Sequence, residues 1–316
     1  MNRDNSLAVL VLIAVIIFVP LVSGSTYVIT IGVFSGINAL IAIGLCILMG
    51  YAGQVSLGQA GFYGIGAYVS ATLTHHYGLP VPLCVAAAMI VSAFAAVILA
   101  VPSLRLKGHY LAVATLSFGE IINIALNEWG PGGPSGFGDI PTFNILDFVF
   151  DTTTSYFYLV WGCVVLVLLF SFNFINSRTG RALRALHGSE LASRAMGLDV
   201  TALKIKVFVI SAAYASLAGS LYAHYVTFIS PSSFTLFYSI LVLMMVVIGG
   251  ITNLWGGVVG AILITILPEL LRSFEEFDVL VYGLILTLSL MFLRRGLVPL
   301  LIERIKQLRG PLIARD

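Results

Sequence analysis

Long apolar runs alternate with short polar connections along most of the chain. A helix that crosses a membrane needs about 20 consecutive, mostly apolar residues. The segments that meet this condition are 7–24, 28–49, 52–74, 83–102, 109–128, 156–175, 205–228, 237–252, 256–272 and 279–294. The Gly-rich segments 52–74 and 256–272 could re-enter the membrane instead of crossing it. The pattern predicts an all-α, polytopic integral membrane protein with about ten helices, which form one transmembrane domain over residues 1–316.

Composition agrees with this class of protein. The 316 residues are 59% hydrophobic and 9% charged, whereas soluble domains carry about 25% charged residues. The first apolar run follows Arg3 and ends in small residues near Gly24, so it could be a secretory signal peptide. Because another apolar run begins at Tyr27, we expect an uncleaved first helix.

The distribution of Lys and Arg predicts the orientation of the helices. Basic residues occur in the connections 103–108 and 177–204 and in the segment after residue 294. The alternate connections 75–82 and 129–155 contain none. Loops rich in Lys and Arg stay in the cytoplasm. Both termini are therefore expected to be cytoplasmic, and an even number of spans agrees because it puts both termini on the same side.

The basic connection 177–204 has the pattern of two short helices. Ser, Thr and Asp favour helix N-caps, and Gly favours the position just after a helix. The expected boundaries are Thr179 and Gly188 for the first helix, Ser189 and Gly197 for the second, and Asp199 or Thr201 for the start of the next span.

Small residues recur at helical spacing inside the apolar segments. In the stretch GYAGQVSLGQAGFYGIGAY, which covers residues 50–68, Ala52, Ser56, Ala60 and Gly64 follow one another every four residues. Helices in lipid associate through small residues that let their backbones approach closely. The positions expected to serve helix packing are Gly61, Gly64, Gly219, Gly256 and Gly260.

Several polar side chains at membrane depth need a separate explanation. Amides and carboxylates are costly in lipid unless protein or water covers them, and Glu120 falls near the middle of its span. It could meet a substrate ammonium or a partner helix, or it could pair with Thr115 or Asn123. His224 is expected to be a hydrogen-bonded structural histidine. The candidates for a translocation path or gate are Gln54, Ser56, Gln59, Thr115 and Glu120.

Five stretches together resemble one family of membrane proteins. They are GYAGQVSLGQAGFYGIGAYVSA, LRLKGHYLAVATLSFGEII, GPGGPSG, RALRALHGSELASRAMGLDVTALKIKVFVISAAYASLAGSLYAHYVTFISP and VVIGGITNLWGGVVGA. In them the chain resembles LivM-type permeases of bacterial branched-chain amino acid ABC transporters, from about residue 30 to residue 295.

The resemblance implies a multi-pass subunit of an ABC importer in the bacterial cytoplasmic (inner) membrane. Its partners would be a homologous LivH-type permease, two cytoplasmic ATPase subunits and a periplasmic solute-binding protein, and a homodimer of permeases is the alternative to the heterodimer. The segment 177–204 would be the cytoplasmic coupling loop, although a merely basic interfacial segment is the alternative. Glu190, Ala192 and Gly197 would stand at its acidic, small and glycine positions, with a Glu-to-Gly spacing one residue longer than in the general importer motif. The candidates for ATPase coupling are Arg181, Ser189, Glu190, Ala192 and Gly197.

Other functions have less support in the sequence. The chain contains no G-x-x-x-x-G-K-[ST] phosphate loop and no H-E-x-x-H motif. We therefore expect no enzyme activity, no metal and no nucleic-acid partner, and we expect ATP and Mg²⁺ only on partner subunits. A permease for urea or short amides is one alternative, and an ion-coupled secondary transporter is another. The three cysteines Cys46, Cys84 and Cys163 are expected to be buried thiols.

Overall fold

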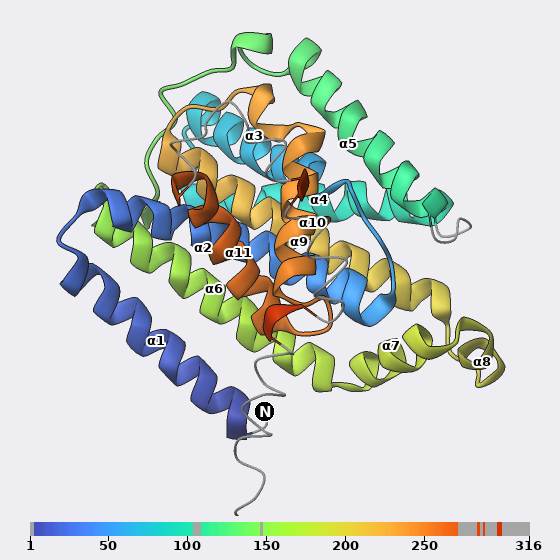
Figure 1. Ribbon diagram of the computed structural model, residues 1–316. Coiled ribbons are helices and arrows are strands. Elements are labelled where there is room, and N and C mark those ends of the chain that lie inside the picture. The colour runs from blue at the N-terminus through green and yellow to red at the C-terminus, as the bar shows by residue number, and fades with distance from the viewer. Residues whose placement is uncertain are drawn as a thin grey trace, which may run out of the picture.

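The computed structural model describes residues 3–103, 109–145, 148–270, 283, 284, 287 and 296–298. Within these residues the fold is all-α, as predicted (Figure 1). The helices are α1 (Arg3–Ser23), α2 (Thr26–Cys46), α3 (Gln59–Tyr77), α4 (Val81–Ser103), α5 (His109–Trp129), α6 (Thr153–Asn176), α7 (Arg178–Gly188), α8 (Glu190–Ala195), α9 (Val200–Val226), α10 (Leu236–Gly249) and α11 (Leu254–Leu270). Shorter elements are a π-helix (Ile47–Tyr51), the 3-10 turns Gly133–Ser135 and Pro231–Phe234, and an antiparallel hairpin of β1 (Asn144–Ile145) and β2 (Phe148–Val149).

Most of the expected spans are present as apolar helices. Among the described residues, five helices are long and apolar enough to cross a membrane, at 26–51, 81–102, 109–129, 153–176 and 200–226. Shorter apolar helices cover 8–22, 236–249 and 254–269. The protein is therefore a multi-pass membrane protein. The expected span 279–294 lies almost entirely outside the described residues, as does the basic tail after it.

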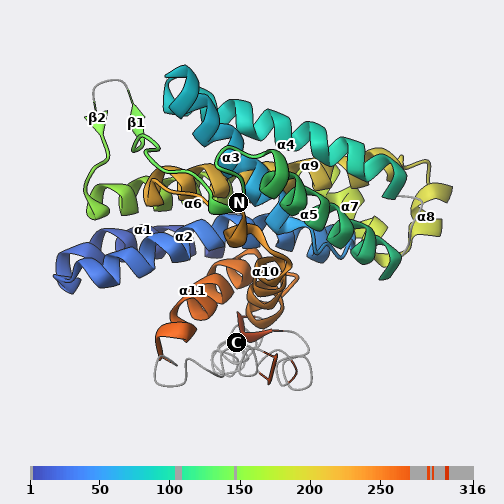
Figure 2. The same ribbon diagram turned by 90° about the horizontal axis from the view of Figure 1, so that it is seen from above.

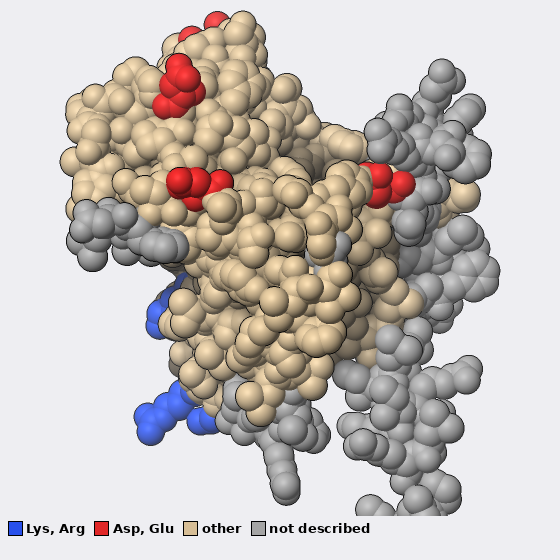
Figure 3. Space-filling view, turned by 90° about the vertical axis from the view of Figure 1, so that its left-hand side faces the viewer, with Lys and Arg blue, Asp and Glu red and all other residues tan. Residues whose placement is uncertain are grey.

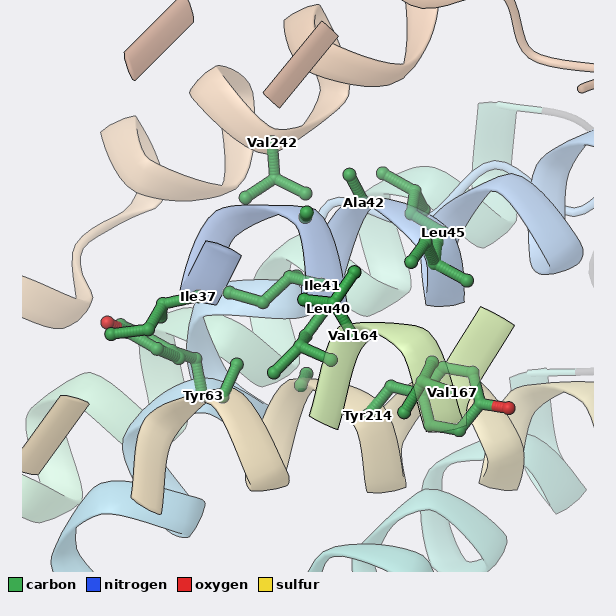
Figure 4. Packing of buried hydrophobic residues seen from close by; sticks show 14 of the residues in the cluster. Ile37, Leu40, Ile41, Ala42, Leu45, Tyr63, Val164, Val167, Tyr214 and Val242 are labelled. Carbon is green, nitrogen blue, oxygen red and sulfur yellow. The ribbon is translucent and has the colours of Figure 1, made fainter. Parts of the chain in front are cut away.

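The helices are arranged around α2. In Figure 2 α10 and α11 lie on one side of a layer that contains α1, α2, α6 and α9, and α4 lies on the other side. The inner residues of this arrangement are large aliphatic and aromatic side chains of α2, α3, α6, α9 and α10 (Figure 4). The second half of α2 contacts protein on all sides, because its residues are 0% exposed at Ala39, Leu40, Ile41, Ala42, Ile43, Leu45 and Cys46. The start of the helix is open, with Tyr27 and Val28 48% and 43% exposed.

The expected helix 52–74 begins later than predicted. Residues 53–58 are not helical, and α3 starts at Gln59. Gly53 has a left-handed backbone with φ +65°, which ends the preceding π-helix because only glycine adopts it without strain. The amide of Leu57 then bonds the Thr115 hydroxyl at 3.0 Å instead of a carbonyl of its own segment. The helix thus starts seven residues after the expected start of the span 52–74, and we call residues 52–58 the break.

The boundaries in the 177–204 connection are predicted better. Ser189 caps α8 by accepting a hydrogen bond from the Ala192 amide at 3.3 Å, and Gly197 follows it with φ +79°. Asp199, not Thr201, caps α9. The expected cap Thr179 is wrong, because Ser177, two residues earlier, accepts the bond from the Gly180 amide at 3.4 Å. Because Asp199 is the cap, the seventh span begins at residue 200 instead of 205.

Charged side chains gather at two opposite ends of the bundle. Figure 3 shows Asp and Glu over the upper part of one face and Lys and Arg over the lower part. The N-terminal end of α1 lies at the same end of the molecule as α7 and α8 (Figure 1). This arrangement is the one expected if the basic loop and the N-terminus share the cytoplasmic side.

Candidate functional site

Two buried amide side chains, Gln54 in the break and Gln59 at the start of α3, are incompletely bonded. Gln54 is 3% exposed, and neither its Nε2 nor its Oε1 has a hydrogen-bond partner among the described residues. Gln59 donates from Nε2 to the Ser211 hydroxyl at 3.1 Å, while its Oε1 has no partner in the same part of the chain. Ser56 is fully buried and accepts a weak bond from the Gly58 amide at 3.4 Å. Buried amides need hydrogen-bond partners, so the break is a polar point inside an apolar bundle.

Thr115 attaches α5 to the break. Its hydroxyl accepts from the Leu57 amide at 3.0 Å and donates to the Ala112 carbonyl at 2.9 Å. A Cβ on Gly61 of α3 would lie 3.1 Å from the Gly119 Cα of α5. Glycines therefore let the backbones of α3 and α5 approach closely about one helical turn beyond Thr115. The start of α3 and the middle of α5 therefore lie in direct contact.

Glu120 does not have the partners that the sequence suggested. It is half-buried, and it makes no hydrogen bond or ion pair with any residue that the structure describes. Thr115 bonds the break, and the Asn123 amide donates to the carbonyls of Pro231 and Phe234 at 2.9 and 3.2 Å. The interpretation of Glu120 as a carboxylate held by its own helix is therefore wrong.

The structure brings four of the five candidate path residues together. Gln54, Ser56, Gln59 and Thr115 surround the break, while Glu120 lies about 7.5 Å farther along the axis of α5 at 1.5 Å per residue. Sequence analysis missed Ser211 and Ser239, whose hydroxyls bond the Gln59 side chain and the Ala60 amide at 3.1 and 3.0 Å. Isolated serines in apolar helices gave no signal for these roles.

The five glycines expected to serve packing all lie at close helix–helix contacts. A Cβ on Gly219 would overlap the Tyr63 carbonyl of α3, and one on Gly64 would lie 3.1 Å from a Leu126 methyl. Gly256 and Gly260 face Gly249 and Met245 of α10 in the same way. Close contact of backbones is the usual means of helix association in lipid.

The coupling segment, residues 177–199, is tied to α9 by one carboxylate. Glu190 bonds Arg194 at 2.8 Å within α8 and the Lys204 ammonium of α9 at 3.0 Å. Partial burial raises the pKa of Glu190, but hydrogen bonds and charge from Lys204 and Arg194 outweigh it and hold the pKa below its usual range. This carboxylate therefore links α8 to the N-terminal part of α9.

A cavity joins the coupling segment to the break. It measures about 370 Å³ and is lined by Ala52, Gly53, Gln54, Leu111, Leu186, His187, Gly188, Ser189, Glu190 and Lys204. A Cβ on Gly53 would lie 3.2 Å from the His187 Nδ1. The end of α7 consequently contacts the break directly. Of the expected coupling residues, Ser189 and Glu190 line this cavity, while Arg181 donates to the Asn176 carbonyl at 3.1 Å.

His224 has a structural role, as expected. Its Nδ1 lies 2.7 Å from the Pro141 carbonyl and its Nε2 lies 2.7 Å from the Ser70 hydroxyl. Because a carbonyl only accepts, Nδ1 carries the proton and Nε2 accepts from the serine. The ring thus joins α3 and α9 to the loop that follows α5.

A broken, polar helix inside an all-α membrane bundle is typical of transport proteins. The chain is a member of the family described as branched-chain amino acid transport system / permease component, whose profile matches residues 27–292. It is 37% identical over 299 residues to the high-affinity branched-chain amino acid transport system permease protein LivM of Salmonella typhimurium, and 36% identical to that of Escherichia coli. Each alignment covers 87% of this chain and 70% of the relative.

A more distant relative is a probable branched-chain amino acid transport permease protein LivM of Methanocaldococcus jannaschii. It is 27% identical over 215 residues, which cover 63% of this chain and 62% of the relative. No solved structure matches the chain significantly. The resemblance found in the sequence motifs is thereby confirmed.

Proposed function

We propose that this chain is the permease subunit of an ABC importer for branched-chain amino acids in the bacterial cytoplasmic membrane. The family match over residues 27–292 carries the proposal, and the named cargo of the two LivM relatives supports it. The chain itself is not an enzyme and binds no nucleotide or metal. ATP and Mg²⁺ act on two separate cytoplasmic ATPase subunits, and a periplasmic solute-binding protein delivers the cargo.

The coupling segment transmits the movement of the ATPases along two routes. One route is the Glu190–Lys204 ion pair, which leads into α9. The other is the contact of His187 with Gly53, which leads into the break. Because α9 packs along α3, and the break directly precedes α3, both routes act on α3. A movement of α8 is therefore accompanied by a movement of the break.

The polar residues of the break form the gate. The unpaired amides of Gln54 and Gln59 gain partners when the gate changes state, because both are buried without full hydrogen bonding in this one. Thr115 and Ser56 hold the polypeptide of the break in place. Glu120 presents a carboxylate on the same helix as Thr115, where an ammonium group of a zwitterionic cargo can pass.

The test is ATP-driven uptake by the purified complex in liposomes, with labelled leucine, isoleucine and valine and with urea and short amides as competitors. We expect leucine uptake that requires ATP and persists when an uncoupler removes ion gradients. Uptake of urea or amides without uptake of leucine, isoleucine or valine would refute branched-chain amino acids as the cargo. Uptake driven by an ion gradient without ATP would refute the proposal that the chain belongs to an ATP-driven importer.

A charge reversal tests the coupling route within the same assay. Glu190→Lys places a cation beside Lys204 and Arg194, so it should abolish uptake and leave membrane insertion unchanged. The matched control is Asp151→Lys, the same reversal at an exposed acid at the opposite end of the molecule. Normal coupled uptake by Glu190→Lys would contradict the role of this ion pair.

A further inference from the structure

A cavity of about 390 Å³ lies between the first helix and the rest of the bundle. Its walls come from α1, α2, α6 and α11, and Figure 1 shows α1 beside α6 at the edge of the molecule. Phe157 and Trp161 of α6 line it and are 3% and 5% exposed. Val15 of α1 and Val28 of α2 line it as well, and they are 49% and 43% exposed. The cavity, which we call the α1 cavity, therefore reaches from the surface of the bundle to buried aromatic side chains.

The two aromatic rings are held in place by α2. A Cβ on Gly32 would lie 2.6 Å from the Phe157 ring, so α2 approaches α6 closely at this glycine. The Trp161 indole N–H donates to the Gly32 carbonyl at 3.0 Å. Both rings are therefore fixed against α2 and leave the space toward α1 open.

The chemistry of the lining excludes water and charged molecules as occupants. Apart from the Ser35 hydroxyl and the Trp161 N–H, which is already bonded, the lining side chains are hydrocarbon. A buried water needs two to four polar partners, and apolar cavities stay dry. A zwitterionic amino acid would find no charged group among these residues. Since the chain is a multi-pass membrane protein, the apolar material around α1 is lipid.

The depth of the α1 cavity matches one leaflet of a bilayer. Its lining runs from Leu12 to Val19 on α1 and from Val28 to Ser35 on α2, which is about 10 Å along each helix. The hydrocarbon of one leaflet is about 15 Å thick, half that of the bilayer core. A helix over the apolar segment 279–294, which lies almost entirely outside the described residues, would be about 24 Å long and too long for this space. An acyl chain of one leaflet has the matching length.

We propose that the α1 cavity binds one acyl chain of a membrane phospholipid from the leaflet opposite the basic loop 177–204. Phe157 and Trp161 lie near the start of α6, and α7 follows the end of α6, so the cavity is in the half of the bundle away from α7. Tyr27 precedes Val28 at the open start of α2, and tyrosine is enriched at the membrane interface, where a lipid headgroup lies.

The bound chain completes the packing of α1 on the bundle. α1 contacts α2 and α6 directly, and the acyl chain fills the space that these contacts leave. An empty space of this size would forfeit the dispersion contacts of its lining atoms. The inference requires a chain that spans the membrane and retains α1, and it does not depend on the proposed cargo.

The experiment uses the intact complex, purified through a tag on this chain and reconstituted in vesicles. The vesicles contain phosphatidylethanolamine with a photoreactive diazirine in the middle of one acyl chain. One sample is irradiated in the vesicles, and another after extensive washing in lipid-free detergent, which removes lipid that merely surrounds the protein. Peptide mass spectrometry then maps the adducts, and the intact mass shows whether α1 is present. Ile90 and Phe94 of α4, which are 70% and 67% exposed, report ordinary lipid contact.

We expect adducts at Phe157 or Trp161 in the washed complex, at least tenfold above those at the two α4 residues. Val28→Trp puts a large ring at the open side of the cavity and should lower these adducts at least fivefold. The matched control is Val91→Trp on α4, where Val91 is 44% exposed against 43% for Val28, and it should leave them unchanged. Val15→Trp fills the cavity from α1 and replaces Val28→Trp if that variant does not co-purify with its partners.

Four results would overturn the proposal. Equal loss of adducts from the α1 cavity and from α4 on washing would indicate surrounding lipid only. Adducts on α4 in vesicles, with none at Phe157 or Trp161, would indicate that other residues of this chain or a partner fill the cavity. Unchanged adducts in both filling variants would place the lipid elsewhere, and a mature chain without α1 would lack the site. The transport activity of the complex enters none of these readouts, so a failure here is distinct from a failure of the proposed function.

Discussion

The contact between α3 and α9 offers a direct test of the packing argument through Gly219→Ala. The added methyl would overlap the Tyr63 carbonyl oxygen and lie 2.9 Å from the Ala67 amide nitrogen. Both are backbone atoms, so neither can rotate away as a side chain would. Restoring an ordinary contact of 3.4 Å to the nitrogen alone requires the helices to separate by about 0.5 Å. The Ser220 hydroxyl, which bonds the Gly66 carbonyl at 3.1 Å, opposes that separation.

Overpacking of this kind costs about 1–3 kcal/mol, which lowers the ratio of folded to unfolded protein roughly 5- to 150-fold. Replacement of glycine by alanine also gains about 1 kcal/mol of helix propensity, and a control must separate the two effects. Gly162 in α6 is suitable because a Cβ there meets nothing within 4 Å. Gly162→Ala should therefore be neutral or stabilising, whereas Gly219→Ala should destabilise.

The assay is thermal unfolding of the purified protein in mild detergent, followed with a dye that becomes fluorescent on reaction with thiols. Cys46 and Cys84 are buried and Cys163 is partly buried, so unfolding exposes them. We expect a midpoint on the order of several degrees lower for Gly219→Ala than for Gly162→Ala. Equal midpoints for the two variants would refute the inference that these helix backbones touch.

Two further predictions concern the break and the coupling segment. Thr115→Val removes the acceptor of the buried Leu57 amide, so we expect slower uptake by this variant and near-normal uptake by Thr115→Ser; equal rates would contradict the role of the hydroxyl. The pKa of Glu190 is lowered in the folded state, so its hold on Lys204 is complete above the usual Glu pKa of about 4.3 and is lost as the pH falls through the lowered value. The rate of hydrogen exchange of residues 190–199, corrected for intrinsic rates, should therefore rise only below a pH of about 4.3 in the wild type. A rise at higher pH would contradict the role of Glu190 in holding Lys204. The same rise in Glu190→Gln would contradict it as well.

Local signals in the sequence predicted the coupling segment well. Ser189, Gly197 and Asp199 act through hydrogen bonds or backbone angles within three or four residues, so their types alone indicate the helix ends. Thr179 was chosen wrongly because Ser177, two residues earlier, satisfies the same rule. The apolar runs likewise predicted the spans, since length and hydropathy are properties of the run itself.

Contacts between distant segments could not be predicted in this way. Nothing local in residues 53–58 distinguishes a broken helix from a Gly-rich one, because the break depends on the Thr115 hydroxyl 58 residues away in sequence from Leu57. Glu120 shows the same limit more strongly. The sequence marks it as exceptional at membrane depth, but neither of the two neighbours that it suggests, Thr115 and Asn123, bonds it in the described part of the chain.

Glycine backbones meet near the turn between α10 and α11 without side chains between them. A Cβ on Gly249 would overlap the Gly256 carbonyl, one on Gly260 would overlap the Met245 carbonyl, and one on Gly50 would overlap the Ile251 carbonyl. No residue is smaller than glycine, so a bulkier residue at one of these positions cannot be compensated by a smaller one opposite. In a selection for restored transport, Gly260→Ala should therefore be rescued only by reversion of the same codon. A larger residue can be accepted at this junction during evolution only if several backbone segments shift at the same time.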